Sequence, residues 1–206
     1  MKPPAHEVRI IGGQWKRSKL PVADQPGLRP TPDRVRETLF NWLGQDLSGW
    51  RCLDAFAGSG ALGFEAASRG AAEVVLLERD LALAASLRQS QQRLKAEALR
   101  IECCDAIAWM GRAAAGSFDL VLLDPPFGSG LGEQALPQAL RLASDDGFIY
   151  LEARQPLPAA PDGWALYRQG RAGAVHFHLL RRILQRASDG YTRDEIGHQP
   201  ARRPEP

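Results

Sequence analysis

Residues 54–63, with the sequence Asp-Ala-Phe-Ala-Gly-Ser-Gly-Ala-Leu-Gly, lie between a short apolar run and a helix-compatible segment. Gly58 and Gly60 allow the backbone to turn tightly and to approach a ligand closely, where a side chain would occupy the ligand's space. A strand, a glycine loop and a helix in this order predict a cofactor site at the first crossover of an α/β fold. The glycine spacing alone fits a dinucleotide equally well, so the neighbouring residues must decide the ligand.

Acidic residues follow the first three apolar runs and favour a cationic ligand. Asp54 stands four residues before Gly58, where it would repel a pyrophosphate but suits an amino group and a sulfonium. Glu78 ends the second run, where a carboxylate can accept two hydrogen bonds from ribose hydroxyls. Asp105 ends the third run, within reach of an adenine amino group. Together these acids predict S-adenosylmethionine; for Glu78 and Asp105 a solvated strand end or a helix cap is the alternative.

Apolar runs alternate with helix-compatible segments from residue 51 onward. The runs lie at 51–56, 73–78, 100–105, 118–124 and 147–153, and the helical segments lie near 60–69, 80–97, 106–113 and 131–143. Strands separated by helices require crossover connections and therefore a parallel sheet covered on both faces. The last two runs, 164–170 and 174–181, are so close that they predict an antiparallel hairpin. This pattern predicts a Rossmann-like, mostly parallel seven-stranded sheet of the class I methyltransferase type.

The fourth run leads directly into Asp124-Pro125-Pro126-Phe127. Consecutive prolines fix the backbone and lack N–H groups, so the turn is rigid and its carbonyls point outward. The Asp124 carboxylate and the Pro125 carbonyl can each accept one N–H of an exocyclic amine, while Phe127 stacks on the base. An aryl amine is a weak nucleophile, because its lone pair is delocalised into the ring. We expect this loop to aim that lone pair at a methyl donor, so that catalysis is mostly alignment.

The N-terminal region predicts a hairpin followed by a helix. Residues 8–22 alternate apolar and basic positions around Gly12-Gly13, which we interpret as the turn. Thr31 is the expected N-cap and Pro32 the first helical residue. The expected buried face carries Val35, Leu39, Trp42 and Leu43, with Arg34, Arg36 and Glu37 largely off it.

Charge is concentrated in the same region. The chain has a net charge of +2, but residues 1–36 hold eight of its 26 Lys and Arg residues against three acids. A basic arm on a mildly acidic body predicts a polyanionic partner, although a solvated surface is the alternative. The residues that we expect to contact RNA are Arg9, Lys16, Arg17, Lys19, Arg34 and Arg36.

Length and composition restrict the class of protein. The 206 residues, of which 44% are hydrophobic, suit one domain with a small appendage. We divide the chain into a basic hairpin arm (1–30), a catalytic domain (31–185) and a disordered polar tail (186–206). No apolar stretch is long enough to span a bilayer, and the N-terminus lacks the apolar core of a secretory signal, so we expect a cytoplasmic protein. The three cysteines and the pair His176 and His178 predict no metal site.

Several of these blocks together resemble one family. Residues 8–22, 27–43, 54–70 and 124–127, with the strand ending at Glu78, are similar to the RsmD family of 16S ribosomal RNA guanine-N2 methyltransferases. The segment Arg-Pro-Thr-Pro-Asp-Arg at 29–34 belongs to the most specific block. The resemblance implies S-adenosylmethionine as cofactor, a guanine N2 in the small ribosomal subunit or its assembly intermediate as acceptor, and a role for residues 31–41 in closing the cofactor site. We expect a monomer without a membrane partner. The cofactor contacts that we assign are Thr31, Asp54, Phe56, Gly58, Ser59, Gly60, Glu78, Arg79, Asp105, Ala106 and Asp124.

Three other functions are compatible with parts of this pattern. The Asp124–Phe127 loop equally suits adenine-N6 methylation of RNA or DNA, but DNA enzymes of that kind usually need a separate recognition domain. A protein amine as acceptor leaves the basic arm unexplained. A catalytically inactive RNA-binding relative is disfavoured by the intact Asp54, Gly58, Gly60 and Asp124.

Overall fold

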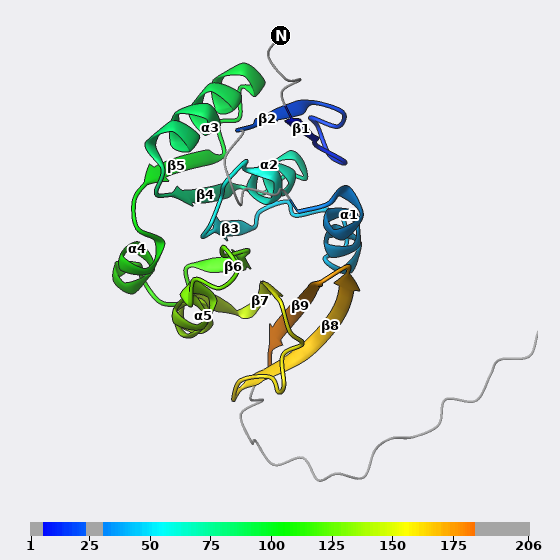
Figure 1. Cartoon of the computed structure of the whole chain (residues 1–206), viewed down its shortest axis with the longest axis vertical. Coiled ribbons are helices and arrows are strands. Elements are labelled where there is room, and N and C mark those ends of the chain that lie inside the picture. The colour runs from blue at the N-terminus through cyan, green and yellow to red at the C-terminus, as the bar shows by residue number, and fades with distance from the viewer. Residues whose placement is uncertain (1–5, 24–30, 184–206) are drawn as a thin grey trace, which may run out of the picture.

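The computed structural model describes residues 6–23 and 31–183 and contains one seven-stranded sheet (Figure 1). The strand order is β5-β4-β3-β6-β7-β9-β8; β9 alone runs antiparallel to both of its neighbours. The strands of this sheet are β3 (Arg51–Asp54), β4 (Glu73–Glu78), β5 (Leu99–Cys103), β6 (Phe118–Leu123), β7 (Ala143–Ala153), β8 (Trp164–Ala172) and β9 (Val175–Arg182). The predicted parallel sheet and its terminal hairpin are confirmed.

Helices cover both faces of the sheet. They are α1 (Asp33–Trp42), α2 (Ala61–Ser68), α3 (Leu81–Leu94), α4 (Ala106–Arg112) and α5 (Leu131–Leu142). The apolar core on one face includes residues of α1, α2 and α3, and the core on the other face includes residues of α4 and α5. Side chains of β6 alternate between the two, with Leu120 and Leu122 in the first core and Val121 and Leu123 in the second. This double burial explains the continuous apolar run of the strand.

The N-terminal hairpin exists, and the connection between its strands is longer than the predicted Gly12-Gly13 turn. Strands β1 (His6–Arg9) and β2 (Lys19–Val22) pair antiparallel, and residues 10–18 connect them. Gly12 and Gly13 lie at bends within this connection, Gly13 with a φ of 72°, and they also pack against α2: a Cβ at Gly13 would lie 1.8 Å from the Ser68 carbonyl oxygen. The glycines therefore serve a close approach between the arm and a helix, which local sequence does not reveal. In Figure 1 the arm lies beside α2 and α3, away from β8 and β9.

Helix α1 begins one residue later than predicted. Its N-cap is Pro32, without a side-chain cap, and Thr31 does not cap it. The Thr31 hydroxyl instead donates to Asp124, on a segment 93 residues away in sequence. Of the predicted apolar face, Val35, Leu39 and Leu43 are buried, whereas Trp42 is only partly buried.

Two regions of the prediction lie outside the described residues. These are the polar tail at 186–206 and the connection at 24–30. Within residues 6–23 and 31–183, no helix has the length and hydropathy needed to cross a membrane.

Candidate active site

A cavity of about 630 Å³ opens at the carboxyl ends of β3, β4, β5 and β6. This is where ligands bind in open α/β sheets. The predicted site residues that line it are Thr31, Asp54, Phe56, Gly58, Ser59, Glu78, Arg79, Asp105, Ala106, Asp124, Pro125, Pro126 and Phe127. The structure thus brings together residues from five segments that are far apart in the sequence.

Gly60 is the one predicted cofactor residue that does not line this cavity. It has a positive φ of 79° at the N-cap of α2, and a Cβ there would lie 2.6 Å from Leu87 Cδ2. Glycine is required at this position because of the turn and its packing, rather than because a ligand comes close.

Asp54 is buried at the end of β3 and joins the strand to α2. Its Oδ2 accepts a 2.9 Å hydrogen bond from the Gly63 N–H. A Cβ at Gly63 would lie 3.0 Å from this oxygen and 2.9 Å from Leu76 Cγ, so the third glycine allows the helix to approach the strand. Burial raises the pKa of Asp54 to about 7, against the opposing effect of the hydrogen bonds from Gly63 and Phe56. A cation placed beside Asp54 would favour its charged form.

Glu78 holds the glycine loop in place. Its Oε2 accepts a 2.9 Å hydrogen bond from the Gly58 N–H, and its Oε1 accepts one of 2.8 Å from the Asp80 N–H. The side chain is buried, yet it lines the cavity. A carboxylate oxygen can accept more than one hydrogen bond, so these contacts leave acceptor capacity for a ligand hydroxyl. The loop-holding role was not predicted, because it depends on the folded path of residues 55–58.

Asp105 is a helix cap as well as a cavity residue. Its Oδ1 accepts a 2.8 Å hydrogen bond from the Ala108 N–H at the start of α4. The side chain is exposed. The alternative stated for this residue, a helix cap, is therefore present in the structure.

Sequence reasoning missed several apolar residues of the cavity. Cys104, interpreted as a filler of a buried strand, lines it, and so do Leu83 and Ile107 in the first turns of α3 and α4. Each of the three lies within five residues of a predicted acid. Position after a strand end was the signal that could have identified them.

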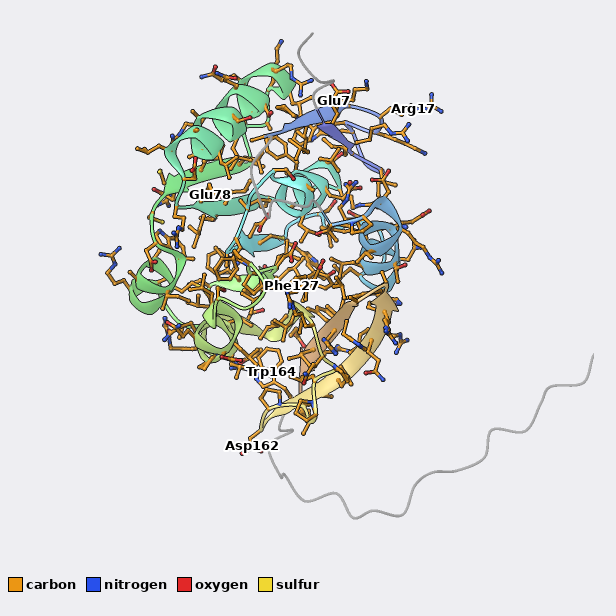
Figure 2. All side chains as sticks on the ribbon, viewed as in Figure 1. Glu7, Arg17, Glu78, Phe127, Asp162 and Trp164 are labelled. Atoms are coloured by element: carbon orange, nitrogen blue, oxygen red, sulfur yellow. The ribbon has the colours of Figure 1, made fainter. Side chains whose placement is uncertain are left out.

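Asp124 and Phe127 line the cavity together with Thr31, which lies two residues before α1. The Thr31 hydroxyl donates to Asp124 Oδ2 at 3.0 Å. Burial, followed by the nearby Glu152, raises the pKa of Asp124 well above its ordinary value. The Phe127 ring is 40% exposed, and the guanidinium carbon of Arg154 lies 5.6 Å from its centroid. Figure 2 shows Phe127 near the centre of the view.

Arg36 does not belong to an RNA-binding surface, in contrast to the prediction. Its side chain is fully buried, and its guanidinium contacts Glu65 Oε2 at 3.3 Å and Asp33 Oδ1 at 2.7 Å. The same guanidinium donates to the carbonyl oxygens of Arg9 at 2.8 Å and Thr31 at 3.2 Å. The partners come from three segments, which satisfies a buried cation that helical periodicity alone assigned to the surface.

Glu65, on α2, connects the N-terminal hairpin to the rest of the protein. Its Oε2 and Oε1 accept 2.8 Å and 2.7 Å hydrogen bonds from the backbone N–H groups of Ile11 and Gly12. It also forms ion pairs with Arg36 and with Arg69, the latter at 2.8 Å. The arm is therefore attached through a buried polar cluster and not through apolar packing alone.

The remaining predicted RNA contacts are exposed. Lys19 pairs with Glu7 at 2.6 Å on the arm, whereas Arg34 lies on the first turn of α1. Figure 2 shows Glu7 and Arg17 on the arm, far from Asp162 and Trp164. The exposed group consists of Arg9, Lys16, Arg17, Lys19 and Arg34.

Comparison with known proteins identifies the family. A family model described as Conserved hypothetical protein 95 matches residues 8–181. Ribosomal RNA small subunit methyltransferase D of Escherichia coli K12 is 44% identical over 201 residues, which cover 92% of this chain and 99% of that protein. The chain belongs to the ribosomal RNA small subunit methyltransferase D family. The Haemophilus influenzae protein of the same name is 42% identical over 85% of this chain and 94% of its own length.

Solved structures agree with this assignment. The structure described as putative methyltransferase yhhF from Escherichia coli superimposes with a TM-score of 0.78 at 41% identity, over 86% of this chain and 98% of that one. The class I methyltransferase fold is confirmed, and the chain is an S-adenosylmethionine-dependent methyltransferase.

Proposed function

We propose that this methyltransferase transfers a methyl group from S-adenosylmethionine to the exocyclic N2 of a guanine in 16S rRNA. The observation that carries the proposal is the shared cavity, into which the glycine loop and the Asp124–Phe127 loop both open. A donor bound at the first loop and a base bound at the second would meet within it. The name of the Escherichia coli relative, which refers to small-subunit ribosomal RNA, supports the acceptor.

The cavity residues fit the donor chemically. S-adenosylmethionine supplies a methyl group on a positively charged sulfur. Buried Asp54 and Glu78 provide negative charge without a compensating cation among their recorded hydrogen bonds in the described part of the chain. A cationic ligand is therefore favoured over a pyrophosphate. We assign the donor's charged end to Asp54 and its ribose to Glu78.

The Asp124–Phe127 loop would position the acceptor. The Asp124 carboxyl group and the Pro125 carbonyl each accept one amine N–H, which turns the nitrogen lone pair out of conjugation. Phe127 is exposed enough for one face to stack on a base. Thr31 keeps Asp124 in place through its hydrogen bond. The loop contributes mainly alignment, which can provide several kcal/mol of the barrier, about 7–11 in favourable cases.

The arm at residues 1–30 is the proposed RNA-contacting part, and residues 31–185 are the proposed catalytic domain. The exposed side chains of Lys16, Arg17 and Lys19 are suited to contact the phosphates of a structured RNA. The major groove of such an RNA is too narrow for side chains to enter, so proteins recognise its shape and charge instead. We infer that the substrate is an assembled or assembling small subunit and that a cytoplasmic monomer acts on it.

The test is a methyl-transfer assay with nucleoside identification. Tritiated S-adenosylmethionine is incubated with small subunits from a strain that lacks this methyltransferase, and the labelled nucleoside is identified after digestion. N2-methylguanosine is the expected product. Label in N6-methyladenosine would overturn the guanine assignment, and absence of label from the RNA would overturn the proposed substrate.

A pair of variants connects the product to the loop. Asp124→Ala should lose most methyl transfer while the donor still binds, because the proposed contacts of Asp124 are to the amine. Asp162→Ala, at an exposed aspartate on a connecting segment, is the matched control and should retain activity. A fully active Asp124→Ala enzyme would contradict the proposed mechanism.

A further inference from the structure

Four polar side chains, Thr31, Asp124, Tyr150 and Glu152, lie together at the Asp124–Phe127 loop and form two hydrogen-bonded pairs. The Tyr150 hydroxyl donates to Glu152 Oε1 at 2.7 Å. Thr31 donates to Asp124 at 3.0 Å, and Glu152 lies close enough to Asp124 to raise its pKa. Tyr150 and Glu152 are buried, with 0% and 4% of their surface exposed. Asp124 also lines the cavity, so the group connects the site to the protein interior.

The sheet itself brings the two carboxyl groups together. Strands β6 and β7 are parallel neighbours in which Leu123 pairs with Leu151. Asp124, the residue directly after β6, and Glu152, on β7, follow this pair and therefore lie side by side. Glu152 also pairs with apolar Phe177 on β9. Two acids are thus fixed in contact by backbone register rather than by flexible loops.

Two adjacent carboxyl groups, of which Glu152 is buried and Asp124 is partly buried, cannot both ionise at low cost. Burial raises the pKa of each, and their mutual repulsion adds to this effect at Asp124. The groups recorded around the pair are the hydroxyls of Thr31 and Tyr150 and the acid Asp54, which raises the pKa of Asp124 further. Such a pair retains one proton over a wide pH range, and its titration belongs to the pair rather than to either residue.

We propose that Glu152 is a positioning residue which shares one proton with Asp124, so that one carboxylate is always available to take the proton lost by the acceptor amine. The proposal rests on the methyltransferase function proposed above. Without Glu152, Asp124 would have no neighbouring carboxyl group with which to share the proton that it receives. With Glu152 beside it, one proton satisfies the pair and a single negative charge remains.

The balance of the step is simple. The amine nitrogen forms the new N–C bond with its lone pair, and the carbon–sulfur bond breaks with its electron pair remaining on sulfur. One amine proton passes to the carboxyl pair, which becomes neutral and later returns a proton to water. The negative charge of the pair and the positive charge of the donor's sulfur are therefore lost together.

Infrared spectroscopy of the ligand-free protein tests the shared proton directly. Wild type should show a protonated carboxyl band at pH 8, where Asp54, with a pKa of about 7, is mostly ionised. Glu152→Gln should lose this band, since Asp124 no longer has an acidic neighbour. Glu97→Gln, at an exposed glutamate, is the control and should retain it.

Tyr150→Phe is a second variant, in which the pKa of the carboxyl pair should rise. The wild-type Tyr150 hydroxyl donates to Glu152 and stabilises its charged form, and this variant removes it. The band should therefore persist to higher pH than in wild type, whereas a purely structural role for Tyr150 predicts no change. An unchanged band in both variants would overturn the proposal even if one of them is poorly stable.

Steady-state kinetics complete the test. Glu152→Gln should lower kcat by about tenfold or more, within the range known for positioned proton acceptors. KM for the small subunit should be unchanged, because Glu152 is buried behind Asp124. Loss of the band with unchanged kcat would overturn the proton-accepting role. Failure of the guanine assignment would appear in the nucleoside analysis alone, since the infrared measurement uses no substrate.

Discussion

The affinity for S-adenosylmethionine should fall as the pH is lowered from 8 to 5, and Asp54 should be the cause. Burial raises the pKa of this carboxyl to about 7, so it is mostly charged at pH 8 and mostly neutral at pH 5. A cationic donor is attracted only by the charged form. The perturbations are the pH itself and the neutral variant Asp54→Asn, whose amide oxygen can still accept the Gly63 N–H.

The size of the effect follows from the pKa. Each pH unit below 7 costs about 1.4 kcal/mol, or tenfold in affinity, if binding requires the charged form. At pH 5 the donor should bind about 100-fold more weakly than at pH 8. Asp54 is 1% exposed, so solvent screening should reduce this figure little.

Calorimetric titrations at pH 5, 6, 7 and 8 would measure this dependence. Asp54→Asn should bind more weakly than wild type at pH 8 but with little change in affinity across the series, and Asp162→Asn should behave like wild type. A wild-type affinity that varies by less than about threefold would refute the assignment of Asp54 to the donor's cation, since the predicted change is about 100-fold.

The raised pKa of Asp54 also predicts how the stability of the folded protein changes with pH. Because its folded pKa lies above the unfolded value, its stabilising contribution is complete below about pH 4 and is lost as the pH rises to 7. As the pH rises from 4 to 7, the free energy of unfolding of the ligand-free wild type should therefore fall by up to about 4 kcal/mol relative to that of Asp54→Asn. Urea unfolding of the two proteins at each pH measures the difference.

Three further results are expected. Glu78→Ala removes a charged acceptor and should weaken donor binding about ten- to hundred-fold in calorimetry, and unchanged binding would contradict the ribose assignment. Phe127→Ala should weaken RNA binding by about 1–3 kcal/mol in filter or fluorescence assays, without changing donor affinity, if the ring stacks on a base. Neutralising Lys16, Arg17 and Lys19 together should flatten the slope of log affinity against log salt by about two units, and an unchanged slope would show that the arm does not touch phosphate.

Local patterns were sufficient for most of the fold. The apolar runs, the helix between each pair of strands and the short link at residues 171–173 each depend on neighbouring residues, and the sheet order follows from few topological choices. The acids at strand ends were predicted to meet because the carboxyl ends of parallel strands share one edge. They do line one cavity.

Long-range partners account for what was missed. Helical periodicity alone placed Arg36 at the surface, and its buried partner Glu65, 29 residues away, could not be identified from neighbouring residues. Glu152 stands in the apolar run at 147–153 and had no visible role until β6 and β7 aligned it with Asp124. A carboxylate within a buried strand next to the Asp124–Phe127 loop was the available signal, and the cost of burying an unpaired acid is its physical basis.

The attachment of the arm through Glu65 has a consequence for selectivity. Because one carboxylate binds the backbone of the arm and Arg36 on α1, the exposed basic residues and the proposed acceptor cavity would be held at one fixed separation. An RNA that engages both must offer its phosphates and its target base at that same separation. The enzyme would then select its substrate by the distance between two contact points on a folded particle. The same base sequence in an unfolded strand would be a poor substrate.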